Sequence, residues 1–216
     1  MAPLFRPSSN TIFRLVLGGG ICGVLGLLGL FYFLERSPYR TGVLMPKGQP
    51  VPFSHQHHVA EVGLDCRYCH FAVEKSSFAG IPPVSVCMNC HRYIWSDSPM
   101  LAPVRDAYQK NETIAWNRVH QLAQFVYFNH SVHISKGVGC STCHGRVDQM
   151  PLMWKVNTLH MNWCLECHRN PEKFIRPKSE VFNMKWEPPK DQIIQGTYLK
   201  MKNHIESKTD CYTCHR

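Results

Sequence analysis

The sequence predicts a mostly irregular chain with short α-helices, organised around bound groups instead of a large apolar core, and preceded by one transmembrane helix. Hydrophobic residues make up 44% of the 216 residues, but many of them lie in one N-terminal block, which leaves a remainder rich in Pro, His, Cys and charge. Ten of the eleven cysteines fall in five copies of Cys-x-x-Cys-His. The length requires only one folded domain besides the N-terminal block.

All five motifs are intact. Two thiols three positions apart lie on one side of a helical turn and can bond covalently to one porphyrin, while the adjacent imidazole binds the iron as proximal ligand. The fold class is therefore a multihaem cytochrome c, with the short helices wrapped around five covalently bound haem c groups. The predicted attachment residues are Cys66, Cys69, Cys87, Cys90, Cys140, Cys143, Cys164, Cys167, Cys211 and Cys214. The predicted proximal ligands are His70, His91, His144, His168 and His215.

A disulfide framework, zinc sites and a thioredoxin-like dithiol are the competing explanations of so many cysteines. Zinc sites would need paired Cys-x-x-Cys units that share one ion, and they would leave the His after each second Cys unexplained. The eleventh cysteine, Cys22, lies inside the N-terminal apolar block and is expected to be a small apolar residue.

Eight further histidines could close the second face of each iron. Phe53-Ser-His55-Gln-His57-His58 and Phe128-Asn-His130-Ser-Val-His133 share Phe-x-His-x-x-His, and each precedes a haem motif. This is an internal repeat, with units at about 53–92 and 128–169 and a terminal site at 211–216. We expect His55, His58, His130 and His133 to be distal iron ligands.

The fifth distal ligand has several candidates. His120, in Trp116-Asn-Arg-Val-His120, is the preferred one. His57, His160 and His204 remain alternatives, and for each of them a surface or propionate-binding role is as good an explanation. Met150, Met153 and Met161 also compete, because a thioether ligand would raise the potential of the haem that it serves.

The formal net charge of +9 would ordinarily suggest nucleic acid or anionic lipid as a partner. Haem propionates offer a nearer explanation, since they bring many carboxylates to the mature protein. We therefore interpret the basic residues as propionate counterions and surface charge, including Arg92, Arg169 and Arg216, which each follow a motif. No nucleic-acid partner is expected.

Residues 15–34 form an uncharged apolar stretch long enough to cross the bilayer as a helix. We predict a cytoplasmic N-terminus at 1–14, an anchor at 15–34, a linker at 35–52 and a haem domain at 53–216 on the periplasmic side of the cell membrane, where haem attachment takes place. A cleavable signal peptide is the alternative, but no small-x-small site follows the stretch. Gly19, Gly23 and Gly26 share one helix face, which could pack against another transmembrane helix.

Two segments between motifs carry local signals. Ser98 and Pro99 predict a short helix to about Lys110, with Ser98 as N-cap and a spacing role. The proline-rich segment 170–190 has neither a helical nor a strand period. We expect it to be an extended strap with little stability of its own, lying over haem faces or a partner subunit before Cys211.

The ordered set FSHQHHV, CRYCH, AGIPPVSVCMNCHR, WNRVH, YFNHSVH, GVGCSTCHGRVDQMP, WCLECHR and CYTCHR closely resembles the pentahaem membrane-anchored subunit of alternative complex III. The resemblance covers essentially the whole chain. It implies assembly with an iron-sulfur and molybdopterin-oxidoreductase-like subunit, polytopic quinol-binding subunits and a monohaem cytochrome c. It also implies menaquinol oxidation by the complex and delivery of electrons to a soluble periplasmic cytochrome or blue-copper protein.

Electron transfer without a catalytic site of its own is the expected function, because irons with two His ligands are closed to substrate. A stand-alone, membrane-anchored quinol dehydrogenase that feeds a periplasmic reductase is the runner-up, although 31 residues separate Leu34 from Cys66, where such proteins place the first motif close to the anchor. A multihaem enzyme with one open iron is a third hypothesis, against which the surplus of histidines argues.

Overall fold

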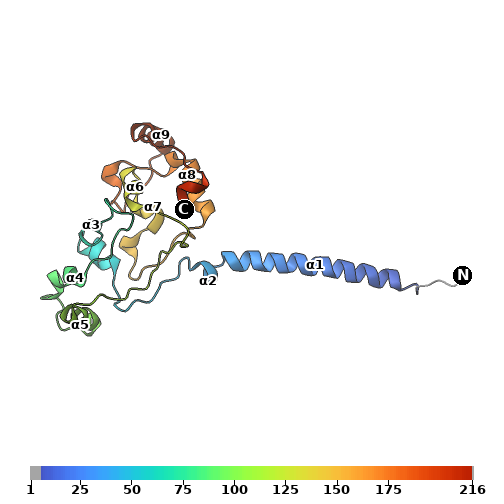
Figure 1. Cartoon of the computed structure of the whole chain (residues 1–216), viewed down its shortest axis with the longest axis horizontal. Coiled ribbons are helices and arrows are strands. Elements are labelled where there is room, and N and C mark those ends of the chain that lie inside the picture. The colour runs from blue at the N-terminus through green and yellow to red at the C-terminus, as the bar shows by residue number, and fades with distance from the viewer. Residues whose placement is uncertain (1–5, 216) are drawn as a thin grey trace. The chain divides into compact units, whose positions relative to one another are not determined.

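The computed structural model describes residues 6–215, which fall into two compact units that divide after Gly42 (Figure 1). The first unit consists of helix α1 (Ser9–Arg36) and the short helix α2 (Pro38–Thr41). Gly42 ends α2 with a φ of 66°, a left-handed conformation that glycine adopts without strain.

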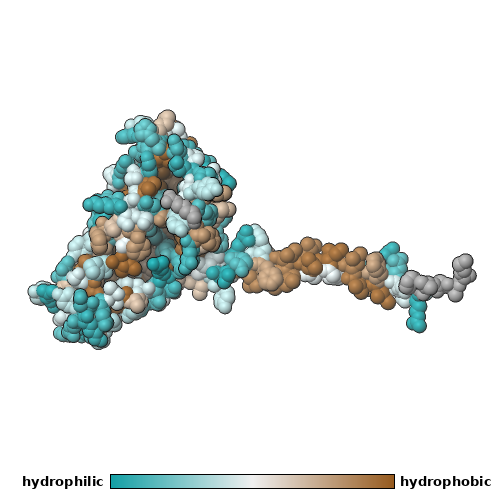
Figure 2. Space-filling view, viewed as in Figure 1, coloured by the Kyte–Doolittle hydropathy of each residue, from teal (hydrophilic) through white to brown (hydrophobic). Residues whose placement is uncertain are grey.

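Helix α1 contains the predicted span 15–34 and extends beyond it at both ends. It is long and apolar enough to cross a membrane, and none of its residues is buried by the rest of the protein. Apolar side chains cover most of its length in Figure 2. The predicted helix is thus confirmed, whereas the choice between an anchor and a signal sequence stays a prediction. Space is open beside Gly19, Gly23 and Gly26, as close packing by another helix would require.

The second unit is built from short helices joined by irregular segments, as predicted. Within residues 6–215 no strand is present, and only two isolated bridges occur, Val43 with Lys155 and Val138 with Ile175. The α-helices of this unit are α3 (Cys66–Cys69), α4 (Val84–His91), α5 (Ala102–Lys110), α6 (His130–Ser135), α7 (Cys140–His144), α8 (Met161–Arg169), α9 (Gln192–Lys202) and α10 (Cys211–Cys214). Its tighter and wider turns are the π-helix η1 (Gln56–Glu61) and the 3₁₀ helices η2 (Pro99–Leu101), η3 (Val147–Gln149), η4 (Pro171–Lys173) and η5 (Lys178–Glu180).

The apolar core of this unit is small, also as predicted. One cluster joins Val51 to α4 and α5 and contains Val84, Met88, Val104 and Ala107. The other cluster is formed by Val147, Met150 and Met184, with Cys66 and Cys140 among the partly buried residues packed against it. Eleven hydrophobic residues in all are buried among those described. Such a core is small for a domain of this length.

The predicted helix at 98–110 is present, but in a different form and role. Its first turn is the 3₁₀ helix η2, and the α-helix proper begins at Ala102. The Ser98 side chain makes no capping hydrogen bond; instead its carbonyl accepts one from Arg105 Nη1 at 2.9 Å. The spacing role is wrong, because Val104 and Ala107 build the core cluster with α4.

The segment 170–190 is not the extended strap that its prolines predict. It contains the helical turns η4 and η5, and it buries Ile175, Val181 and Met184, so that it supplies part of the core. Helix α9 follows it and was not predicted at all. Hydrophobic periodicity does not predict the burial of these residues, because tertiary contacts hold them and they do not share one regular element.

Helix α9 docks closely onto η4 at Gly196. The side chain of Gln192 donates to the carbonyls of Glu172 (3.0 Å) and Ile175 (2.9 Å), and Lys200 pairs with the Glu172 carboxylate at 3.3 Å. A Cβ atom at Gly196 would lie 1.9 Å from the Glu172 carbonyl oxygen, so no larger residue fits without moving the backbone.

We therefore expect Gly196→Ala to lower the free energy of unfolding by about 3 kcal/mol, as overpacking of a rigid contact does. The measurement is thermal unfolding of the purified full chain followed by circular dichroism. Thr197→Ala is the matched control, because Thr197 is exposed and should change the stability by less than about 0.5 kcal/mol. Equal melting temperatures for the two variants would contradict the close approach of α9 and η4.

Candidate haem sites

All five pairs of motif cysteines lie on helices, which places both thiols of each pair on one helical turn. The helices are α3, α4, α7, α8 and α10. Acidic caps begin two of them: the Asp65 carboxylate accepts from the Arg67 amide at 2.8 Å, and the Asp210 carboxylate accepts from the Thr213 amide at 3.0 Å. The helical turn that the motif spacing predicts is thus present at each site.

Four proximal histidines are held in the same way, by a hydrogen bond from Nδ1 to a backbone carbonyl. A carbonyl can only accept, so Nδ1 carries the proton and Nε2 keeps its lone pair for a metal. Such a bond also fixes the ring orientation, as in well-ordered metal sites. The bonds join His70 to Gly80 (2.7 Å), His91 to Ile94 (3.0 Å), His168 to Lys208 (2.8 Å) and His215 to Phe125 (3.1 Å).

The two Phe-x-His-x-x-His segments have nearly the same local geometry. Phe53 stacks on His58 with ring centroids 4.3 Å apart, and Phe128 stacks on His133 at 4.4 Å. The first His of each pair meets the same Phe edge to face, at 4.9 Å in the first unit and 4.8 Å in the second. The repeat found in the sequence is therefore also a repeat of side-chain geometry.

Each sequence repeat holds one His pair and two motifs. The second His of the pair faces the proximal His of the second motif in the same repeat. The ring centroids of His58 and His91 are 6.1 Å apart, and those of His133 and His168 are also 6.1 Å apart. Two imidazoles that share one iron have ring centres about 6 Å apart, since each metal–nitrogen bond is about 2 Å. Both spacings match that requirement.

Nδ1 of these second histidines is bonded to the carbonyl four residues earlier. His58 donates to Ser54 at 2.8 Å, and His133 donates to Asn129 at 2.7 Å. In both rings Nε2 is therefore the nitrogen that remains for a metal. Equivalent positions of the two units thus present the same donor atom.

The first histidines of the pairs lie in a half-buried group of imidazoles around the first and third motifs. His130 is 6.4 Å from His144 and nearly parallel to it, at an interplanar angle of 7°. His55 and His70 lie near the same group and affect the charge of its members. His130 Nδ1 also donates to the Ser77 carbonyl at 2.9 Å, which connects the second sequence repeat to the loop after the first motif.

His120 belongs to this group and is not placed beside His215. Its ring centroid is 4.3 Å from that of His144, in an edge-to-face contact that is too close for the two rings to share one iron. Its Nε2 is buried and has no hydrogen-bond partner. The ring contacts of His215 include Phe125 at 5.6 Å and no imidazole within residues 6–215.

Burial keeps the imidazoles of His55, His120 and His144 neutral. It lowers the pKa of His55 and of His120 to about 4 and that of His144 to about 3; neighbouring imidazoles lower the pKa of all three further, as does Lys155 for His120. Neutral imidazole is the form that binds a metal. Burial also raises the pKa of the Cys143 thiol to about 12, whereas reactive dithiols show a lowered pKa.

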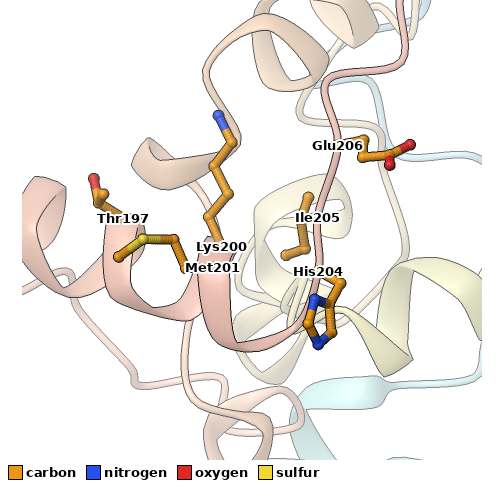
Figure 3. A pocket seen from close by; sticks show the side chains of 6 residues that line it. All are labelled: Thr197, Lys200, Met201, His204, Ile205 and Glu206. Atoms are coloured by element: carbon orange, nitrogen blue, oxygen red, sulfur yellow. The ribbon is translucent and has the colours of Figure 1, made fainter.

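The alternative fifth ligands lie in other surroundings. His57 pairs with Glu61 at 2.7 Å and stacks on Trp95 at 5.4 Å. His160 is exposed at the start of α8. His204 lines a cavity of about 540 Å³ with Lys200, Met201 and Glu206 among its neighbours (Figure 3).

The methionine candidates differ from one another. Met150 is 1% exposed and is packed into the second core cluster, with Met153 against it. Met161 is exposed at the start of α8. A packed thioether such as that of Met150 has no free direction toward a metal.

The residues present fit covalently held haem better than a bare metal ion. Among the described residues no group of three or more His, Cys, Asp or Glu side chains could hold a metal ion by itself. Two buried imidazole nitrogens, His55 Nδ1 and His120 Nε2, have no partner. Large apolar side chains beside the motifs are more than half exposed, such as Phe71, Phe78 and Phe125, and a porphyrin would cover such surfaces.

One charged residue at these sites was missed from the sequence. Arg176 is only 3% exposed and lies against the third motif. Its place in a proline-rich segment without periodicity gave no signal of burial. An arginine that close to a motif could have been found only from the tertiary contacts.

Two comparisons with known proteins bear on these sites. The family model of cytochrome c7 and related cytochrome c matches residues 126–216, which contain the second sequence repeat (128–169) and the terminal motif. The chain is 30% identical over 145 residues to the multiheme cytochrome c subunit of menaquinone reductase from Nitratidesulfovibrio vulgaris (strain Hildenborough). That match covers 57% of this chain and 69% of the relative.

Proposed function

The chain belongs to the multihaem cytochrome c family, and from this premise we propose that it carries electrons through five c-type haems. Membership of the family makes it an electron-transfer protein with covalently bound haem c. We infer the count of five haems from the five Cys-x-x-Cys-His motifs, each of which has its cysteines on a helix. The observation that carries the proposal is the pairing of imidazoles across a space that suits one iron.

We assign the axial ligands from these pairs. His58 and His91 hold the second haem, His133 and His168 the fourth, and His130 and His144 the third. The internal repeat then assigns His55 to His70 at the first haem. His120 stays the candidate fifth distal ligand because its Nε2 is buried and unpartnered, although its ring lies against His144 and not beside His215.

Each haem, when bound, takes up and releases one electron at its iron. The cysteines of this chain would fix each haem to a helix, and the paired imidazoles would bind its iron and exclude substrate from it. Backbone carbonyls hold the proximal rings in one orientation, so little rearrangement accompanies each electron. This arrangement supports electron transfer and provides no catalytic site.

We further propose that the chain is the anchored cytochrome subunit of a membrane quinone oxidoreductase of the alternative complex III type. Helix α1 would anchor it with the N-terminus in the cytoplasm and the haem domain on the periplasmic side. The partners would be an iron-sulfur and molybdopterin-like subunit, polytopic quinol-binding subunits and a monohaem cytochrome c. Electrons would pass from menaquinol to a soluble periplasmic cytochrome or blue-copper acceptor.

The name of the relative favours a second candidate, in which electrons run the other way. A menaquinone reductase delivers electrons to the quinone. The two directions use the same ligands and the same anchor, so the potentials of the haems relative to the menaquinone couple distinguish them. Haems at or above that couple favour quinol oxidation, and haems well below it favour quinone reduction.

Mass spectrometry of the purified full chain tests the haem count. We expect a mass that exceeds the polypeptide by five haems, and trypsin should release five haem-bearing peptides. A mass with fewer adducts would reduce the count, and free thiols at the motifs would contradict the proposal altogether.

Anaerobic addition of menaquinol tests the assembly and the direction. In native membranes we expect the α-band of the haems to appear rapidly, because the quinol-binding partners are present. The full chain purified alone in detergent should stay oxidised on the same timescale. Equally rapid reduction of the purified chain would favour the stand-alone quinol dehydrogenase.

A further inference from the structure

Arg176 has the lowest exposure of any charged side chain among the described residues. Its Nη2 donates to Ser141 Oγ at 3.1 Å and to Thr142 Oγ1 at 3.0 Å. These two residues stand between Cys140 and Cys143 in the third motif. The guanidinium therefore lies directly against the turn of α7 that carries the attachment cysteines.

The guanidinium is in contact with several other groups of the same unit. Its Cζ lies 4.2 Å from the centroid of the Trp186 ring, and Nη1 donates to the Asn183 carbonyl at 3.3 Å. A Cβ atom at Gly139 would lie 2.1 Å from Cζ, so only glycine permits this contact. Stacking on an aromatic ring and several directed donors are typical of a fixed arginine.

No carboxylate side chain of the described residues forms an ion pair with Arg176. None of the ion pairs within residues 6–215 involves it, and its buried Nε has no hydrogen-bond partner. Glu180 attracts it only from beyond ion-pair distance. By contrast, Arg146 after the same motif pairs with Asp148 at 2.7 Å, and Arg67 in the first motif pairs with Asp65 at 2.8 Å.

We propose that Arg176 is a positioning residue whose buried charge raises the reduction potential of the haem attached at Cys140 and Cys143. Reduction adds one electron to that site, and a fixed cation in a weakly screened interior stabilises the reduced form relative to the oxidised form. This inference rests on the proposed haem at the third motif. It assigns to the segment 170–190 the tuning of one particular haem.

The test is a potentiometric titration of the full chain, with each haem followed by NMR of its methyl groups. For Arg176→Gln we expect the one-electron reduction equilibrium of the third haem to fall about tenfold, which corresponds to a shift of 59 mV to lower potential. The other haems should move less. Arg176→Lys keeps the charge and should retain most of the potential, whereas equal shifts for Gln and Lys would overturn the proposal.

Lys178→Gln is the matched control, because it removes an exposed cation two residues along the same segment and should leave the third haem unchanged. If Arg176→Gln does not fold, the unsubstituted chain still decides. Its third haem should have a higher potential than its first, whose nearby Arg67 is paired, and the reverse order would overturn the proposal. The haem count separates the two claims: a missing third haem counts against the proposed function, and five haems without the expected shift count against Arg176 alone.

Discussion

Replacement of His58 by alanine is expected to convert one haem of the chain from low-spin to high-spin, whereas replacement of its neighbour His57 is not. The His58 ring lies 6.1 Å from that of His91, and its Nδ1 donates to the Ser54 carbonyl, which leaves Nε2 as the nitrogen that could bind a metal. Loss of this imidazole leaves one axial position empty. The measurement is low-temperature electron paramagnetic resonance of the oxidised full chain, in which a high-spin ferric signal of about one haem should appear.

His57→Ala is a close control because His57 is adjacent in sequence and is held elsewhere, by Glu61 and by Trp95. His133→Ala should repeat the effect on a different haem, since His133 and His168 have the same spacing. The double variant His58→Ala, His133→Ala should then give two high-spin haems. A fully low-spin spectrum for His58→Ala would remove the assigned pairing, and a high-spin signal in His57→Ala would reassign the ligand.

Replacement of both Cys140 and Cys143 by serine is expected to remove one haem and to destabilise the whole second unit. Cys140 packs against the cluster of Val147, Met150 and Met184, and other imidazoles lie near His144 of the same motif. Without the haem, these side chains would border a large void. We expect a loss of more than about 5 kcal/mol in the free energy of unfolding, beyond that of deleting one large core side chain.

The haem loss is read from the mass of the full chain, which should show four adducts, and the stability from its thermal unfolding. Cys22→Ser is the control, because Cys22 lies in α1 outside the motifs and should leave five haems and an unchanged melting temperature. A haem count equal to that of the unsubstituted chain would show that Cys140 and Cys143 do not attach haem. An unchanged melting temperature would show that the haem is not part of the core.

The parts of the site that were predictable are those set by local spacing. A Cys-x-x-Cys-His stretch predicts both the turn and the ligands, and the two cysteines of each motif lie on a helix. The Phe-x-His-x-x-His repeat predicted equivalent roles for His55 and His130 and for His58 and His133, and the two units show equivalent ring contacts. Helix α1 was predictable because twenty uncharged residues leave few other possibilities.

The parts that were not predictable depend on distant contacts. Ile175, Val181 and Met184 are buried although their spacing matches no regular element. Helix α9 follows two prolines and contains β-branched residues and Gly196, all of which lower helix propensity. Its contacts with Glu172 stabilise it. Glu172 lies about twenty residues before the helix, so the local sequence gives no sign of these contacts.

Which histidines lie next to one another in the fold could likewise not be predicted from local sequence patterns. His120 precedes the second sequence repeat by a few residues, yet its ring lies against His144 and not against His215. The carbonyl that holds His215 belongs to Phe125, ninety residues earlier in the chain. Spacing predicts which histidines are ligands, whereas the contacts between them depend on how the irregular segments cross.

The small core has a consequence for the maturation of the chain. Two clusters of a few side chains can stabilise the second unit only weakly before the cofactors are attached. A chain that has missed an attachment step therefore remains accessible to proteases and chaperones, while a fully loaded chain does not. Cellular quality control can thus discard incompletely loaded molecules without any dedicated recognition signal.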